Sequence, residues 1–235
     1  MSDIKEFIEK CGYDFPNNEY NVYKFEEPTL NKKYGSIKVL SIKLNKSKGI
    51  PIIVIPGYSH KSFCSMLKII LDGLEHIIDK YSQLLMFQWS PEIKENSEML
   101  IKDIKDVNIQ YEINEKYRIE LANILNKILQ SSDIELNKFD LMGKSAGGGI
   151  AAYIAKINNN VNKLILISPG SISHGENLNK YNNKIILSWN EDDPIITKDE
   201  IDKYIENFDK NNNNYKYYTF NKGGHEINMK LLEKL

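Results

Sequence analysis

The residues best suited to chemistry lie in the sequence GKSAG, where Ser145 is the centre of a G-x-S-x-G pattern. The run KFDLM before it is typical of a strand, and the residues after it are typical of a helix. A sharp strand-to-helix turn exposes a nucleophile, and small neighbours let the two elements pass closely. A phosphate-binding loop would instead need a glycine where Lys138 stands. We therefore interpret Ser145 as a nucleophile; the alternative is a small structural residue in a tight turn.

A serine hydroxyl becomes reactive when a base removes its proton, so a histidine should lie nearby. His225 is the strongest candidate, because it follows the last predicted strand and the two glycines before it permit a tight loop. Among the other histidines, His76 lies inside a helical stretch and His174 lies in a loop that nothing fixes. His60 follows PGYS and could line the pocket. His225 is thus the predicted base.

A carboxylate should orient that histidine, and the segment LSWNEDDPII supplies three of them directly after a predicted strand. We select Asp193, because the proline that follows it stiffens the turn. Asp192 stays as the alternative acid, and an ordinary turn residue is the alternative role for Asp193. Lys144, at the variable position of the serine motif, is expected to be a solvated side chain.

These motifs, in the order serine, aspartate, histidine, resemble those of the α/β-hydrolase family from about residue 36 to the end of the chain. The family's G-x-x-D-x-(V/I)-x loop corresponds to residues 190–196, with asparagine in place of glycine, and the resemblance places the acid on Asp193. The family's oxyanion loop corresponds to residues 56–58, with proline in place of histidine. The resemblance thus implies an oxyanion hole made by the backbone N–H groups of Tyr58 and Ala146.

Short apolar runs alternate with helical periodicity, which predicts a mainly parallel sheet covered by helices. The resemblance implies that this is the α/β-hydrolase fold, with about seven to eight strands and helices on both faces of the sheet. The expected strands are 36–44 (edge or antiparallel), 50–56, 83–89, 138–143, 163–168, 184–189 and 215–220. The expected helices are 62–78, a helix from the N-cap Asn114, 146–157, one from the capping box of Thr197 and Glu200, and a short one after Ile227.

We expect a single domain over residues 1–235, with an N-terminal helix and a first strand region in 1–35. Residues 168–184 are too few for a cap domain between two late strands. The longer excursion at 90–113 either folds over the pocket as a lid or forms an ordinary crossover helix, and the sequence leaves both open.

The composition is that of a soluble globular protein, with 41% hydrophobic and 27% charged residues and a net charge of −1. No basic patch predicts a nucleic-acid partner, and no apolar run is long enough to span a membrane. The N-terminal segment shows no secretory signal, and the two cysteines, Cys11 and Cys64, argue against a disulfide framework and for a reducing compartment. We expect a cytoplasmic protein without cofactor or metal, with Cys64 as a small buried apolar residue; the oligomeric state is open.

The resemblance implies hydrolysis of a small ester through an acyl-enzyme, because the expected site has no cap. Thioester hydrolysis or acyl transfer by the same three residues is the first alternative. The second alternative is a non-catalytic α/β-hydrolase fold that binds a small ligand.

Overall fold

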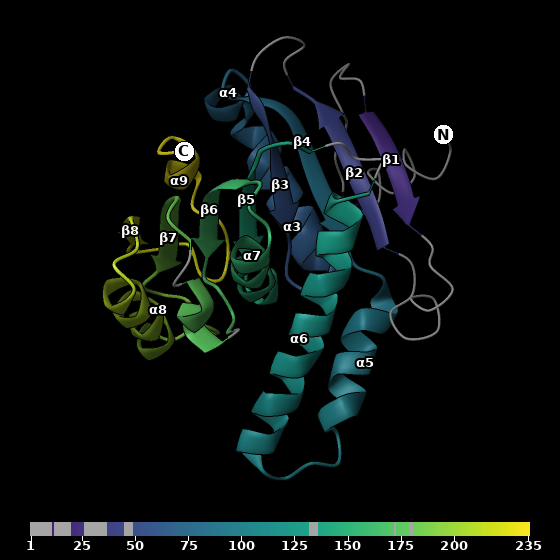
Figure 1. Ribbon diagram of the computed structural model, residues 1–235, viewed down its shortest axis with the longest axis vertical. Coiled ribbons are helices and arrows are strands. Elements are labelled where there is room, and N and C mark those ends of the chain that lie inside the picture. Colours follow the sequence, from purple (N-terminus) through teal and green to yellow (C-terminus); the bar gives the residue numbers. More distant parts are fainter. Residues whose placement is uncertain are drawn as a thin grey trace.

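The computed structural model describes residues 11, 20–25, 37–44, 49–131, 136–171, 173–178 and 181–235. In these residues an eight-stranded sheet lies between two layers of helices (Figure 1). The strand order is β1-β2-β4-β3-β5-β6-β7-β8; β2 is antiparallel to both of its neighbours, and every other pair is parallel. The strands are β1 (Tyr20–Phe25), β2 (Ile37–Lys43), β3 (Ile50–Ile55), β4 (Tyr81–Gln88), β5 (Phe139–Lys144), β6 (Val161–Ile167), β7 (Lys184–Asn190) and β8 (Tyr215–Phe220). The predicted fold class is confirmed.

Each face of the sheet packs against its own set of helices. One set comprises α3 (His60–Asp72), α4 (Leu74–Ile77) and α9 (Met229–Leu232). The other comprises α5 (Pro91–Ile101), α6 (Val107–Leu129), α7 (Ala146–Ile157), α8 (Lys198–Lys210) and the 3-10 helix η1 (Ser173–Leu178). Apolar side chains at alternate strand positions therefore fall into two buried clusters, one on each side of the sheet.

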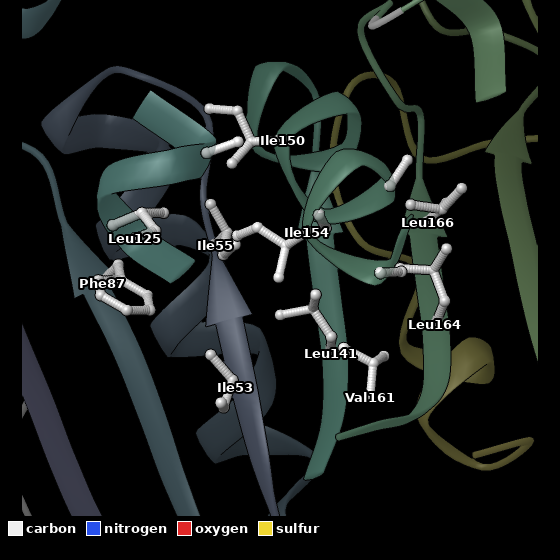
Figure 2. Close-up of a cluster of buried hydrophobic side chains, with 14 of the residues drawn as sticks. Ile53, Ile55, Phe87, Leu125, Leu141, Ile150, Ile154, Val161, Leu164 and Leu166 are labelled. Atoms are coloured by element: carbon white, nitrogen blue, oxygen red, sulfur yellow. The ribbon is translucent and has the colours of Figure 1, made fainter. Parts of the chain in front are cut away.

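Strand β5 shows this division most simply. Leu141 lies in the cluster under α6 and α7, whereas Met142 lies in the cluster under α3 and α9. Figure 2 shows the first cluster, in which isoleucines of α7 pack onto β3, β5 and β6. Because both faces of β5 are buried, all six of its residues are inaccessible, and the strand ends rigidly at the serine turn.

Helix α6 begins earlier than the sequence predicts. Asp106, not Asn114, is its N-cap, and the Asp106 carboxylate accepts hydrogen bonds from the N–H groups of Asn108 and Ile109. The predicted apolar face begins at Tyr117, which is buried. The preceding turns pair with α5 in a hairpin that extends beyond the sheet (Figure 1), so they lack the core-facing periodicity on which the prediction relied.

The other helices differ little from expectation. The predicted helix 62–78 is divided at Gly73, where a β-carbon would lie 2.5 Å from a methyl group of Leu232. The capping box of Thr197 and Glu200 is present. Between β6 and β7 the described residues form only η1, as expected for a chain without a cap there. The predicted N-terminal helix lies outside the described residues, whereas β1 provides the expected first strand.

The two cysteines form a disulfide between residue 11 and α3. The expectation that Cys64 is a simple apolar residue is therefore wrong. The bond also counts against a reducing compartment, because disulfides persist in oxidising surroundings. No helix in the described part of the chain is long and apolar enough to cross a membrane.

Candidate active site

Ser145 occupies a strained turn between β5 and α7. Its backbone has φ of 56° and ψ of −130°, a conformation that L-residues rarely adopt. Glycines make the turn possible: a β-carbon on Gly147 would lie 2.2 Å from the carbonyl oxygen of Ile55, and one on Gly143 would lie 2.3 Å from the carbonyl oxygen of Gly147. The small residues thus permit the close contact between strand and helix that the sequence predicts.

The loop after β3 lies against this turn. A β-carbon on Gly57 would lie 3.4 Å from the β-carbon of Ser145. Two bonds hold the loop in place: Gly57 N–H donates to Ser62 Oγ at 3.1 Å, and Trp89 Nε1–H donates to the carbonyl oxygen of Pro56 at 2.8 Å. The loop therefore presents its backbone to Ser145 in a fixed position.

The backbone N–H groups of Tyr58 and Ala146 lie in this loop and at the first residue of α7. Among the described residues, neither N–H group has a protein acceptor. Free N–H groups at a helix start favour negative charge. Both are therefore available for the oxyanion role that the resemblance implies.

The Tyr58 side chain packs the loop after β3 against neighbouring aromatic residues. Its ring makes edge contacts with Trp89 and Tyr117, at centroid distances of 5.8 Å and 6.4 Å. Burial raises the pKa of Tyr58 to about 12, an effect that the neighbouring Arg118 only partly offsets. The phenol is therefore neutral, and its role is to pack the loop against α6.

Asp193 and His225 are in direct contact. The Nδ1 atom of His225 lies 2.9 Å from Oδ2 of Asp193 and 3.1 Å from its Oδ1. Burial alone would raise the pKa of Asp193, but hydrogen bonds from the Ile196 N–H, the His225 ring and the Ile195 N–H outweigh it, so this pKa lies below its ordinary value of 3.8. Asp193 is thus an anion at neutral pH, in place to orient the imidazole.

Asp192, the alternative acid, has another partner. Its carboxylate accepts the Gly224 N–H at 2.7 Å. Asn190, at the family's glycine position, is buried, and its Nδ2 donates to the carbonyl oxygens of Gly224 at 2.9 Å and Glu226 at 2.8 Å. Both side chains therefore fasten the histidine loop to the end of β7, a role that the sequence analysis did not foresee.

Lys144 is buried, so the expectation of a solvated side chain is wrong. Its side chain is 2% exposed, and its Nζ lies 2.5 Å from Oε2 of Glu226. The alternation of β5 would have revealed this position, because Lys144 shares the sheet face of Met142, which is covered by α3 and α9.

A pocket of about 520 Å³ lies over the turn. Ser145 and His225 both line it, together with the loop after β3, Ile195 and Lys94, Ser97 and Glu98 of α5. The excursion at 90–113 thus contributes one wall of the pocket. Among the described residues no hydrogen bond joins Ser145 Oγ to His225, a contact that commonly tightens only when substrate binds.

The remaining candidate residues lie elsewhere or are not described. His76 is on α4, beside Glu75, as a helical surface residue. The side chains of His60 and His174 lie outside the described residues. No group of three His, Cys, Asp or Glu side chains in the described part of the chain could hold a metal ion.

Several solved structures share this fold, although no curated protein is detectably similar in sequence. A predicted CIB-like hydrolase from Thermoplasma acidophilum is 16% identical, with 93% of this chain and 94% of that chain covered and a TM-score of 0.60. Est1E from Butyrivibrio proteoclasticus is 11% identical, with 91% and 94% covered and a TM-score of 0.56. A dienelactone hydrolase-like promiscuous phosphotriesterase from metagenomic libraries is 9% identical, with 88% and 83% covered and a TM-score of 0.59. At these identities the likeness shows the fold.

The family follows from the sequence itself. Residues 90–231, more than half of the chain, match the model of the dienelactone hydrolase family. The match includes the serine turn, the aspartate loop and the histidine loop that meet at the pocket. The chain is therefore a hydrolase of the α/β-hydrolase superfamily and belongs to the dienelactone hydrolase family.

Proposed function

We propose that the protein hydrolyses small carboxylic esters, with Ser145 as nucleophile, His225 as general base and acid, and Asp193 as the group that orients the histidine. One observation carries the proposal: His225, hydrogen-bonded to the buried side chain of Asp193, lines the same pocket as a serine held at φ of 56°. Each of the three residues follows a different strand: β5, β7 or β8. Their convergence on one pocket is what a nucleophile, its base and its orienting acid require.

The reaction proceeds in two steps. The Ser145 oxygen attacks the ester carbonyl while His225 Nε2 takes its proton, and the Tyr58 and Ala146 N–H groups bind the oxyanion. His225 then gives that proton to the departing alcohol, which leaves an acyl group on Ser145. Water, deprotonated by His225, attacks the acyl-enzyme, and the proton returns to the serine as the carboxylic acid is released. Asp193 remains an anion throughout and stabilises the charged imidazole.

The substrate proposed is small. The pocket has a volume of about 520 Å³, and no cap domain stands between β6 and β7 in the described residues. Its walls combine α5 on one side with the loops after β3 and β7. A short acyl chain fits such a pocket, whereas a long lipid chain would leave much of its length in water.

The decisive experiment is labelling with a fluorophosphonate probe, followed by mass determination of the modified peptide. Wild-type protein should carry one adduct, on Ser145, and Ser145→Ala should carry none. Ser131→Ala, at the far end of α6, is the matched control and should be labelled like the wild type. Equal labelling of Ser145→Ala and wild type would disprove the proposed nucleophile.

Product analysis separates the remaining alternatives. With short p-nitrophenyl esters and acyl thioesters, an esterase should favour the oxygen ester and release free acid even when alcohols or thiols are supplied. Formation of new esters or thioesters would identify acyl transfer instead. Binding of a small ligand without turnover of any substrate would indicate a non-catalytic protein.

A further inference from the structure

A charged contact beside the proposed catalytic residues has no role in the steps above. The Lys144 ammonium, buried under α3 and α9, lies 2.5 Å from Oε2 of Glu226. Ser65 on α3 donates a hydrogen bond to the same oxygen at 2.8 Å. The Glu226 side chain is 40% exposed and lines the pocket, so this ion pair joins the interior to the pocket wall.

The sequence positions of the pair are informative. Lys144 is the residue before Ser145, and Glu226 is the residue after His225. The contact therefore connects the strand that presents the nucleophile with the loop that presents the base. Apart from the Ser65 bond to α3, the loop is held by Asn190, Asp192 and Asp193, which all lie at or just after the end of β7.

Contacts to the end of β7 orient the imidazole but do not set its distance from the serine, because β6 separates β7 from β5 in the sheet. Proton transfer needs His225 Nε2 within about 2.6–3.2 Å of Ser145 Oγ. The Lys144–Glu226 bond joins the end of β5 directly to the histidine loop.

We infer that Lys144 and Glu226 are positioning residues that set the distance between His225 and Ser145 for the chemical step. The inference rests on the proposed function. A buried ion pair is by itself weak evidence of a stabilising role, since the cost of desolvating its charges can exceed their attraction. Its place between nucleophile and base gives it a different use: it fastens the histidine loop to the strand that carries the serine.

The test measures kcat and KM on a short p-nitrophenyl ester for Lys144→Met, Glu226→Ala and the double variant. Each should lower kcat by about ten- to a hundredfold, the effect expected of a displacement near 1 Å, while KM changes little. The double variant should be no worse than either single one, because all three break the same contact. Glu226→Gln should keep most of the activity, since its amide oxygen still accepts from Lys144 and Ser65.

Three controls complete the design. Glu233→Ala removes an exposed carboxylate from the same C-terminal segment and should leave kcat unchanged. Urea unfolding of every variant reports folding, and Lys144→Met, which fills the buried space without a charge, carries the test if Glu226→Ala does not fold. Added acetate should not restore Glu226→Ala, because a free anion can neutralise Lys144 but cannot fasten the loop.

The outcomes are separable from those of the proposed function. Absence of wild-type turnover and of Ser145 labelling would refute the proposed function. An active wild type with unchanged kcat in folded Lys144→Met would overturn the positioning role alone. Rescue by acetate, or a Glu226→Gln variant as slow as Glu226→Ala, would also overturn it, because charge compensation and not attachment would then explain the effect.

Discussion

Asp192 and Asp193 show how adjacent residues of one type differ in role through their contacts. The Asp193 carboxylate contacts the imidazole and accepts two backbone N–H groups, whereas the Asp192 carboxylate holds the Gly224 N–H. The low pKa of Asp193 follows from these donors, which favour its charged form despite burial. Both side chains therefore hold the histidine loop: Asp193 contacts the His225 ring, and Asp192 binds the backbone at Gly224.

Removal of the Asp193 charge should affect the chemistry directly. In Asp193→Asn the amide no longer favours the imidazole tautomer with its proton on Nδ1, so kcat should fall by about 10³- to 10⁴-fold. Fluorophosphonate labelling of Ser145 should slow in parallel. Ester hydrolysis under saturating substrate, with circular dichroism to verify folding, measures the effect.

Asp192→Asn is the matched control for this prediction. Its amide oxygen can still accept the Gly224 N–H, so kcat should stay within about threefold of wild type if hydrogen bonding, not charge, is its role. A loss in Asp192→Asn as large as that in Asp193→Asn would contradict the assignment of the acid.

Residue types and their order along the chain led to the prediction of Ser145, Asp193 and His225, because each belongs to a short local motif; the structure brings Asp193 into contact with His225, which lines the same pocket as Ser145. The contacts of Asn190 and Lys144 were not predictable in this way, since they cross 36 and 82 positions of sequence. A local sequence motif can indicate a candidate base or acid, but it does not show which residue, distant in sequence, holds the loop that carries it. Strand alternation would have indicated one of these positions, because it places Lys144 on the same buried sheet face as Met142.

At the scale of elements, the strand-to-helix turn depends on the distance between β3 and α7. Gly147 has the closest approach, with a potential β-carbon 2.2 Å from Ile55 O and 2.5 Å from Pro56 O. Both neighbours are backbone atoms at the start of the oxyanion loop and cannot rotate away. Widening this contact would move Ser145 away from the loop after β3, and so would separate the proposed nucleophile from the proposed oxyanion donor of Tyr58.

Gly147→Ala should therefore destabilise the fold by about 3 kcal/mol or more, although alanine normally favours a helix over glycine. Ester hydrolysis by the folded fraction should fall as well. Urea unfolding gives the stability change. Gly224→Ala is the comparison: no atom lies within 4 Å of its potential β-carbon, so only its φ of 54° opposes the change, at a cost of about 1–2 kcal/mol. Equal losses of stability in the two variants would show that close packing is not the reason why position 147 requires glycine.

Periodicity predicted the elements wherever they face the core and failed where they do not. The strands and the face of α6 from Tyr117 onward agree with the expectation because burial imposes the pattern. The hairpin of α5 and the first turns of α6 exposes Met99, Val107 and Ile109, so its apolar residues do not form a buried face that would fix where its helices begin. Helix α6 begins at the N-cap Asp106. Many other Asp, Asn, Ser and Thr residues of the chain could cap a helix equally well, so this residue alone does not predict the helix start.

At the scale of the whole molecule, the candidate active site lies where the carboxyl ends of β3, β5 and β7 meet, and the histidine loop after β8 completes it. Helix α3 supports this edge in two places, since Ser62 holds Gly57 and Ser65 holds Glu226. The Cys11–Cys64 disulfide joins the N-terminal segment to the same helix, between these two serines. The disulfide therefore anchors the N-terminal segment to α3, the helix whose serines hold two residues that line the pocket.

Loss of this disulfide should lower the free energy of unfolding. It closes a loop with a sequence separation of 53, and constraint of the unfolded chain by a loop of that size contributes about 2–4 kcal/mol. Dithiothreitol should lower the urea midpoint of the wild type, and Cys64→Ala should lower it to the same value and make it insensitive to dithiothreitol. Alkylation of the unreduced, denatured protein should find no free thiol. Two alkylated cysteines in protein kept under air would contradict the bond.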